Sequence, residues 1–310
     1  MPRALKPSLW WLILPGLAAL ALLQGRPRNR QPVHQAEWLQ AGDALLRTVR
    51  AGNGDTTVFL IHGFGESLFT WRAVVDPLAI RHRVVAVDLP GFGGSTKPDA
   101  SYALGPMTDR LSDFLDRWTA GPVVIVGHSM GGELAAALAL ARPDRIKAVV
   151  LIAPAGWGVG LGGIADTMYP TKARAIGWYL SSRAFVLPEH DDDWLGEPDS
   201  MASYSLVGDS TYRRAASRVL QQFDFRALRD RFGSLTQPVQ LIWGTLDPVI
   251  PFVLADSVAT AIPCVRKTVL DGALHRPQVE IPDRVTAIVI AFMGDPSCKT
   301  ENLPPTSISK

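Results

Sequence analysis

The chain has 310 residues, of which 47% are hydrophobic, and it carries a net charge of +2 at neutral pH. A chain of this length can bury one large core, or a core plus a smaller inserted unit, and its composition excludes an intrinsically disordered protein. The 31 basic residues are balanced by 29 acidic ones and form no basic stripe interleaved with aromatics, so we expect no nucleic-acid partner.

An apolar segment near the N-terminus is the first feature along the chain. Residues 7–25 carry no charge, and basic residues flank them on both sides. Because a membrane-spanning helix needs about 20 apolar residues, the segment predicts an uncleaved anchor and membrane association. Export after signal-peptide cleavage is the alternative, but the candidate cleavage site, Ala19-Leu20-Ala21, lies inside the apolar run. We therefore expect residues 1–37 to form a membrane segment and a polar linker, in an orientation that the flanking charges leave open.

Apolar strands and helices then alternate through residues 38–156. A segment from Trp38 to Arg50, broken at Gly42-Asp43, predicts an opening hairpin. Short apolar runs without alternation predict strands that are buried on both faces, as in a parallel sheet. These runs are Thr57–Ile61, Arg83–Asp88, Pro122–Val126 and Lys147–Ile152. Helices are predicted over 107–119 and 133–141.

The strand pattern stops between residues 157 and 235, where the sequence is helical in character and rich in aromatics. We interpret this stretch as a helical cap inserted over one edge of the sheet, with some of its aromatics lining an apolar pocket. The second part of the core is predicted over 236–293. Its strands and helices are expected at Val239–Trp243, Val265–Leu270, 252–261 and 282–293. Residues 294–310 are expected to form a disordered tail.

A G-x-S-x-G motif, Gly127-His128-Ser129-Met130-Gly131, directly follows the strand that ends at Val126. A helical run of small residues comes after it. This order of strand, sharp turn and helix is typical of a nucleophile elbow, which lifts a serine hydroxyl to the edge of the sheet. Its neighbours must be small because the strand and the helix pass close together. The sequence therefore indicates Ser129 as a catalytic nucleophile.

A serine hydroxyl needs a histidine as base and an acid that orients the histidine. Two histidines follow the serine, and His275 is favoured over His190 because it comes just after a predicted strand, whose rigid end can hold it. Asp247 follows the preceding strand and is the predicted acid. Asp271 is the nearest rival, but it lies close before the histidine in sequence and is expected to cap the turn.

Two backbone N–H groups are expected to bind the oxyanion of a tetrahedral intermediate. One belongs to Met130, which follows the serine. The other belongs to Phe64, in the glycine-rich loop His62-Gly63-Phe64-Gly65 after a predicted strand. For His62 and His128 we expect structural roles, namely orienting the loop and packing the elbow, rather than proton transfer.

Together these motifs resemble the α/β-hydrolase fold family, in the branch that carries a helical cap. The segment Asp88-Leu89-Pro90-Gly91-Phe92-Gly93-Gly94-Ser95 and the stretch from His275 to Pro282 are similar to two further motifs of that branch. The resemblance covers about residues 38–293. It implies a mostly parallel, eight-stranded α/β sheet flanked by helices, and a serine hydrolase that acts on a small molecule.

Three functions are open to such a chain. Cleavage of carboxylic esters with an apolar, lipid-derived acyl part through an acyl-enzyme is preferred. Relatives that hydrolyse carbon–carbon bonds of diketone-like ring-fission products usually carry Asn before the serine and Trp after the histidine, where this chain has His128 and Arg276. A catalytically idle protein that binds a small molecule is the third, and the complete set of Ser129, Asp247 and His275 argues against it.

Two weaker signals complete the analysis. The sequence His190-Asp191-Asp192-Asp193 has metal-ligating side chains, but consecutive acids in a loop are more often a solvated face, so no metal or cofactor is expected. Cys264 and Cys298 match no zinc or redox spacing. A disulfide between them would tether the tail in an oxidising compartment, but two free thiols are the favoured interpretation.

Overall fold

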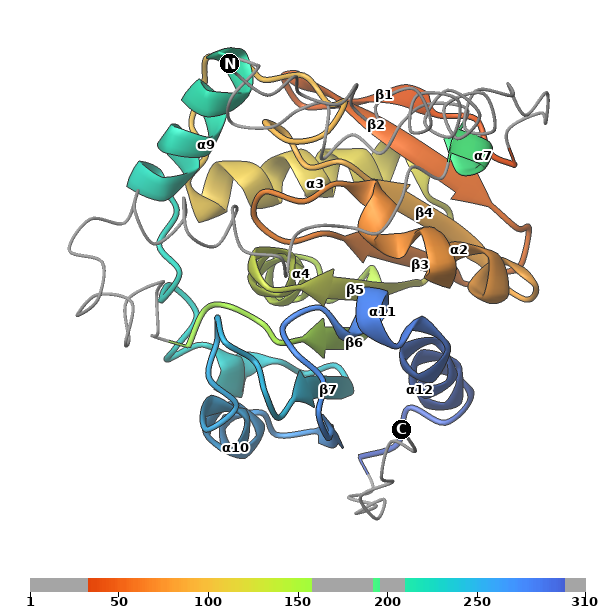
Figure 1. Cartoon of the computed structure of the whole chain (residues 1–310), viewed down its shortest axis with the longest axis vertical. Helices are drawn as coiled ribbons and strands as arrows, with labels where there is room; N and C mark the ends of the chain where they lie inside the picture. Colours follow the sequence, from red (N-terminus) through yellow and green to blue (C-terminus); the bar gives the residue numbers. More distant parts are fainter. Residues whose placement is uncertain (1–32, 158–191, 196–209, 299–310) are drawn as a thin grey trace, which may run out of the picture.

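The computed structural model describes residues 33–157, 192–195 and 210–298 (Figure 1). Its centre is an eight-stranded sheet in the spatial order β1-β2-β4-β3-β5-β6-β7-β8. β1 pairs with β2 and β2 with β4 in antiparallel fashion, whereas all later pairs in the sheet are parallel. The predicted mostly parallel, eight-stranded α/β sheet is therefore confirmed.

The strands and helices alternate along the chain as the sequence predicts. The strands are β1 (Glu37–Ala41), β2 (Ala44–Ala51), β3 (Thr57–Ile61), β4 (Arg83–Val87), β5 (Val123–His128), β6 (Ile146–Ile152), β7 (Val239–Gly244) and β8 (Val265–Leu270). The helices are η1 (Leu68–Trp71), α2 (Arg72–Ala79), α3 (Leu104–Trp118), α4 (Met130–Ala141), α7 (Asp192–Leu195), α9 (Ser210–Gln222), η3 (Phe232–Ser234), α10 (Leu254–Ala261), α11 (Pro277–Glu280) and α12 (Pro282–Gly294). The opening hairpin is confirmed, since β1 and β2 turn at Gly42, whose positive φ of 57° suits glycine.

The two faces of the sheet bury separate hydrophobic clusters. Successive side chains of a strand point to opposite faces, so Ile125 of β5 joins one cluster and its neighbours Val124 and Val126 join the other. Helices α3, α4 and α10 cover the first face, and η1, α2 and α12 cover the second (Figure 1). Burial on both faces explains why β5 is apolar from Val123 to Val126 rather than alternating.

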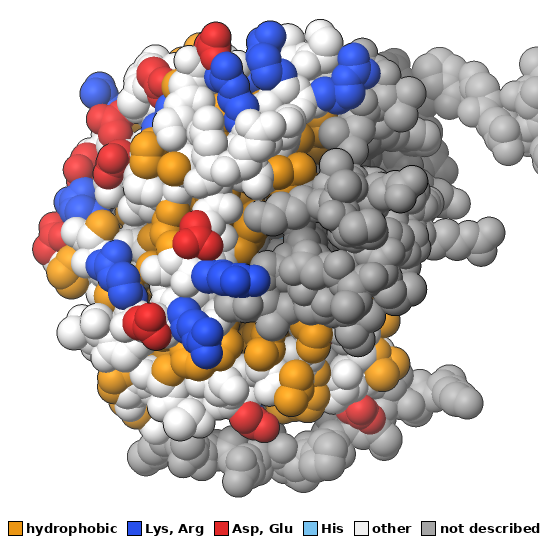
Figure 2. Space-filling view, turned by 90° about the vertical axis from the view of Figure 1, so that its left-hand side faces the viewer, with side chains coloured by type: hydrophobic (Ala, Val, Ile, Leu, Met, Phe, Trp, Pro, Cys, Tyr) orange, Lys and Arg blue, Asp and Glu red, His pale blue; other side chains and the backbone are white. Residues whose placement is uncertain are grey.

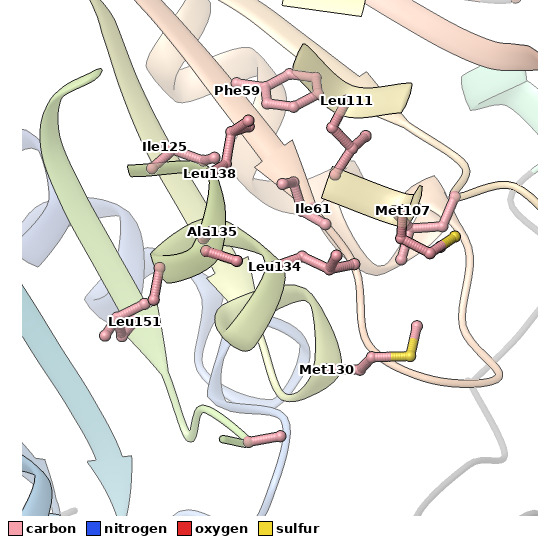
Figure 3. Close-up of a cluster of buried hydrophobic side chains, with 14 of the residues drawn as sticks. Phe59, Ile61, Met107, Leu111, Ile125, Met130, Leu134, Ala135, Leu138 and Leu151 are labelled. Carbon is pink, nitrogen blue, oxygen red and sulfur yellow. The ribbon is translucent and has the colours of Figure 1, made fainter. Parts of the chain in front are cut away.

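The centre of the first cluster lies between α3, α4 and the middle strands (Figure 3). Leu134 and Leu138 of α4 pack with Ile125 of β5 and Phe59 of β3, and all four are fully buried. Each buried side chain of this size stabilises the fold by about 1.5–3 kcal/mol. This packing holds α4, and therefore the residue that precedes it, firmly against the sheet.

Helix α3 begins earlier than the sequence analysis predicts. The expected start was residue 107, whereas the helix starts at Leu104 and includes Gly105 and Pro106 in its first turn. Proline is tolerated in the first turn because the N–H that it lacks would have no partner inside the helix there. The Gly-Pro pair therefore lies within the beginning of this helix rather than before it.

Parts of the predicted cap are described, and they include the helices α7 and α9. Tyr212, Ala215 and Val219 of α9 are buried in the first hydrophobic cluster. At the end of the same helix, the Gln222 side chain accepts a hydrogen bond of 2.7 Å from the N–H of Tyr102. The short helix α7 packs on the other side, where Trp194 contacts η1. The remainder of the predicted cap lies outside the described residues, so the cap boundaries stay a prediction.

The C-terminal segment corrects the interpretation of the cysteines. Cys264 and Cys298 form a disulfide, with Cα atoms 5.0 Å apart, although the sequence analysis favoured free thiols. The start of β8 and the segment after α12 lie together, as the Arg266 side chain also donates a 3.3 Å hydrogen bond to the Ser297 carbonyl. Folding therefore brings together two residues that are 34 positions apart in sequence. The tail beyond residue 298 lies outside the described part.

The predicted membrane segment at residues 7–25 also lies outside the described residues. Within 33–157, 192–195 and 210–298, the structure contains no helix of the length and apolar character that a bilayer requires.

The face that carries α9 and α10 shows basic and acidic side chains interspersed with apolar ones (Figure 2). That mixture agrees with the nearly balanced charge of the whole chain.

Candidate active site

Ser129 occupies the sharp turn between β5 and α4. Its backbone has φ 53° and ψ −119°, in the region that side-chain-bearing residues rarely adopt. Such a conformation costs about 1–3 kcal/mol and persists only where the surrounding structure enforces it. The enforcement comes partly from hydrogen bonds, because the Ser129 N–H donates to the Ile152 carbonyl at 3.0 Å and its own carbonyl accepts from Ala155 at 3.0 Å.

The glycines of the motif are required by close backbone approach. A Cβ atom added at Gly127 would lie 2.1 Å from the Gly131 carbonyl oxygen, and one added at Gly131 would lie 2.4 Å from the carbonyl oxygen of Ile61. Both separations are far inside van der Waals contact, so a side chain at either position would force the strand and the helix apart. The nucleophile-elbow geometry predicted from the G-x-S-x-G motif is present.

Asp247 and His275 form a buried pair at the carboxyl ends of β7 and β8. The Asp247 Oδ2 atom lies 2.8 Å from Nδ1 of His275, and both side chains are buried. The other carboxylate oxygen accepts hydrogen bonds from the backbone N–H groups of Val249 and Ile250, at 2.8 and 2.9 Å. The aspartate is thereby fixed, and the proton on His275 is assigned to Nδ1, which leaves Nε2 with a lone pair.

The histidine loop lies directly against the elbow. The carbonyl oxygen of His275 is 2.8 Å from Nε2 of His128, the residue immediately before the serine. The two imidazole rings are also in contact, with centroids 4.7 Å apart. Ser129, Asp247 and His275, predicted from separate parts of the chain, therefore lie at one edge of the sheet.

The glycine-rich loop after β3 also lies beside the serine. A Cβ atom added at Gly63 would lie 3.2 Å from Cβ of Ser129, which shows how closely the loop approaches the elbow. His62 fixes the loop, because its Nδ1 donates to the Gly63 carbonyl at 2.7 Å and its Nε2 accepts from the N–H of Leu89 at 2.9 Å. Burial lowers the pKa of His62, which favours the neutral ring that these bonds require.

The two predicted oxyanion donors lie on the segments that flank Ser129. Phe64 follows Gly63 in the loop. Its ring is buried and makes an edge contact with the ring of Phe92, with ring centroids 5.4 Å apart. Met130 is the first residue of α4 and is fully buried, with its side chain at the end of the cluster in Figure 3. Hydrophobic anchoring of both side chains holds their backbone segments in place around Ser129.

The sequence analysis did not identify Glu66, which lies directly after the glycine-rich loop. It is 1% exposed, and its carboxylate lies 2.9 Å from Nδ1 of His128. A second group, the guanidinium of Arg276, lies 3.7 Å from the same carboxylate. The two positions at which this chain departs from the carbon–carbon bond hydrolases thus both face Glu66. The sequence does contain a signal for this contact, namely an acid directly after the glycine-rich loop and a histidine directly before the serine.

The residues that the sequence offered as alternatives to Asp247 and His275, or as metal ligands, lie elsewhere. Asp271 accepts a 3.1 Å hydrogen bond from the Thr245 hydroxyl in an exposed turn, in agreement with the expected capping role. His190 lies outside the described residues, as does Asp191, and the side chains of Asp192 and Asp193 are not described either. In the described part of the chain, no group of three or more acidic, His or Cys side chains is arranged to hold a metal ion.

The fold and the strained serine at this edge define the class of the protein as an α/β hydrolase. The family model for the alpha/beta hydrolase fold matches residues 56–282, so the chain belongs to that family.

The chain is 43% identical over 261 residues to the dihydrolipoyllysine-residue acetyltransferase component of an acetoin cleaving system from Cupriavidus necator. The match covers 80% of this chain and 66% of that protein, so the chain spans just under two thirds of its length. It is 28% identical over 263 residues to the pimeloyl-(acyl-carrier protein) methyl ester esterase of Aeromonas hydrophila, which covers 79% of this chain and 98% of the esterase. The structure of a meta-cleavage product hydrolase from Pseudomonas fluorescens IP01 superposes with a TM-score of 0.68 at 21% identity, over 84% of this chain and 97% of that one.

Proposed function

We propose that this protein is a serine hydrolase that cleaves carboxylic esters with an apolar acyl part through an acyl-enzyme. The observation that carries the proposal is the strained Ser129 at the same sheet edge as the buried Asp247–His275 pair. Similarity to an esterase that acts on an acyl methyl ester supports the choice of an ester bond. The aromatic-rich segment 157–235 supports an apolar acyl group.

In this mechanism His275 is the general base. Its Nε2 takes the proton of the Ser129 hydroxyl as the serine oxygen attacks the ester carbonyl carbon. Asp247 holds the ring through Nδ1 and stabilises the imidazolium that forms. The N–H groups of Phe64 and Met130 stabilise the negative charge on the tetrahedral intermediate. The alcohol leaves with the proton from His275, and water, activated by the same histidine, then releases the acid.

Replacement of the nucleophile tests the proposal. A fluorophosphonate probe is expected to label the wild-type protein and to leave Ser129→Ala unlabelled. Ester turnover is expected to fall by about 10³-fold or more in both Ser129→Ala and His275→Ala, because the members of a triad act as a unit. Ser217→Ala, which changes an exposed serine on α9, is the matched control and is expected to keep wild-type labelling. Unchanged turnover in either triad variant would refute the assignment.

A carbon–carbon bond hydrolase is the alternative, and the solved meta-cleavage product hydrolase shares the fold. The same assay separates the two functions when it compares chromogenic esters of increasing acyl length with a diketone-like ring-fission product. We expect turnover of the esters, with a preference for longer acyl chains over acetate. Turnover of the diketone alone would favour the alternative. Absence of both phosphonate labelling and turnover of either class would favour a third, binding-only protein.

The proposed location is a membrane surface, with residues 7–25 as the anchor. The Cys264–Cys298 disulfide supports an oxidising compartment for the folded domain, because reducing compartments keep such thiols unpaired. Export after cleavage of the N-terminal segment is the alternative, and it leads to the same compartment.

A further inference from the structure

Behind the proposed catalytic residues lies a buried carboxylate that the mechanism does not use. The Oε2 atom of Glu66 accepts a 2.9 Å hydrogen bond from the N–H of Gly63 and lies 2.9 Å from Nδ1 of His128. Its Oε1 atom lies 3.7 Å from the Arg276 guanidinium. One side chain therefore contacts the oxyanion loop, the nucleophile elbow and the histidine loop.

The hydrogen bonds of this cluster follow from its donors and acceptors. Nε2 of His128 faces the His275 carbonyl oxygen at 2.8 Å, and a carbonyl only accepts, so Nε2 carries a hydrogen. Oε2 of Glu66 accepts from the Gly63 N–H, and its 2.9 Å contact with Nδ1 of His128 holds one further hydrogen. Glu66 and His128 are therefore a hydrogen-bonded pair, with both side chains fully buried.

The charge on Glu66 is consistent with its surroundings. Burial alone raises the pKa of a carboxyl group, because it disfavours the charged form. Here the charge and the hydrogen bond of His128, with smaller contributions from Arg276 and the Gly63 N–H, outweigh burial and hold the pKa of Glu66 well below its ordinary value. A buried carboxylate of this kind is tolerated only when hydrogen bonds satisfy it.

We propose that the hydrogen-bonded Glu66–His128 pair is a positioning device that fixes the oxyanion loop and the His275 loop relative to Ser129. The inference rests on the proposed serine-hydrolase function. Gly63 immediately precedes the proposed donor Phe64, and the His275 carbonyl belongs to the same residue as the proposed base. The pair therefore restrains the backbone of both from behind, while touching neither substrate nor reacting atoms.

Glu66→Gln removes the charge and nearly keeps the shape. A neutral His128 that still donates to the His275 carbonyl must accept at Nδ1, so the introduced amide turns its NH₂ toward the ring and the Gly63 N–H loses its acceptor. The loop is then held less firmly. Because misplacement of a reacting group by about 1 Å can cost about 10²-fold, kcat is expected to fall by about 10- to 100-fold, with KM changed by less than about threefold.

The experiment measures kcat per competent active site in the full chain. Excess fluorophosphonate, taken to completion, counts the labelled Ser129 in each preparation, and the labelling rate gives a second readout of the same chemistry. Glu37→Gln is the matched control, because Glu37 is half-exposed and pairs with Arg50 on β2, away from this cluster. It is expected to keep wild-type kcat. Glu66→Asp, which retains the charge, is expected to keep more activity than Glu66→Gln.

The outcomes separate the two proposals. If the wild-type protein is not labelled, the serine-hydrolase function itself fails. If it is labelled but Glu66→Gln keeps kcat per labelled site within about threefold, or Glu66→Asp is the worse variant, the pair only fills space and the positioning role is overturned. Should Glu66→Gln fail to fold, His128→Gln takes its place and is judged by the same threefold limit in kcat per labelled site.

Discussion

Glu133 is a second buried acid close to Ser129, and its environment differs from that of Glu66. It lies on the first turn of α4 and is fully buried. Burial, and then the negative charge of Asp224, raise the pKa of Glu133 well above its ordinary value, and the N–H of Ala227 offsets them only partly. Among the described residues no cation compensates the charged form, so the folded protein favours the neutral acid.

This raised pKa predicts a stability that falls as the pH rises. The folded protein binds the Glu133 proton more tightly than the unfolded chain does, so its stabilising effect is complete below the unfolded pKa and is lost as the pH rises through the folded pKa. Glu133→Gln removes this pH-dependent loss of stability, because an amide does not ionise. We expect it to raise the free energy of unfolding at pH 8 by at least about 1 kcal/mol relative to the wild type, and to have a small effect at pH 4.

Urea unfolding at the two pH values measures this difference, with Glu37→Gln as the surface control. Equal effects of Glu133→Gln at both pH values, or a loss of stability at pH 8, would show that Glu133 is charged in the folded protein.

At the same residue scale, the sequence indicates the candidate triad but not the residues that contact it from behind. Ser129 stands in a motif whose neighbours are set by local geometry, and His275 and Asp247 follow predicted strands, so each is found from its own surroundings. Glu66 and His128 each stand beside a recognised motif, yet their partnership spans 62 residues, and the contact of His128 with the His275 carbonyl spans 147. Such pairs depend on the packing of the whole sheet.

Among the elements, β2, β4 and η1 are joined by one buried ion pair. Arg47 of β2 donates through Nε to Asp88, just after β4, at 2.6 Å, and both side chains are fully buried. The same carboxylate accepts from the N–H of Leu68 at 2.6 Å and of Gly94 at 2.7 Å. Asp88 therefore fixes the turn that follows β4 and the start of η1 against the hairpin.

Asp88→Asn is expected to destabilise the protein by about 3–5 kcal/mol, because it removes the negative partner of a fully buried ion pair. Against a total stability of about 5–15 kcal/mol, the loss is visible as a large shift of the urea midpoint. Asp116→Asn is the matched control, since Asp116 is about half-exposed where it pairs with Arg142 and Arg145, and its loss is expected to cost about 1 kcal/mol or less. A loss below about 1 kcal/mol in Asp88→Asn would contradict this role.

The bounds of strands and helices can be predicted closely from the sequence where the burial of apolar side chains determines the pattern. The predicted strands Thr57–Ile61 and Val265–Leu270 coincide with β3 and β8. Thr57–Ile61 is an almost wholly apolar run of strand length that polar and turn residues bound. The start of α3 was missed because Gly105-Pro106 has two roles, as a break between elements and as a first helical turn. Propensity alone does not choose between them, since packing of the following turns decides.

For the whole molecule, the sequence offers the disulfide only as the alternative to free thiols, since the spacing of Cys264 and Cys298 carries no signal until β8 and the segment after α12 pack together. The disulfide closes a loop across 34 positions. In the chain-entropy account a bridge of this span contributes roughly 3–4 kcal/mol, by restricting the unfolded chain. Cys298→Ser is therefore expected to lower the free energy of unfolding by roughly 2–4 kcal/mol, and reductant is expected to lower that of the wild type alone.

The Cys264–Cys298 disulfide also tests the proposed compartment. The full chain is isolated from the cells that naturally produce it, with a reagent present that blocks free thiols. A maleimide reagent is expected to modify neither cysteine in the denatured wild-type protein until a reductant is added, and the protein is expected to sediment with membranes. Modification of two thiols without reductant would place the domain in a reducing compartment, against the proposal. Recovery of an oxidised but soluble chain that lacks residues 7–25 would instead favour export after cleavage, because the disulfide forms on the same side of the membrane in either case.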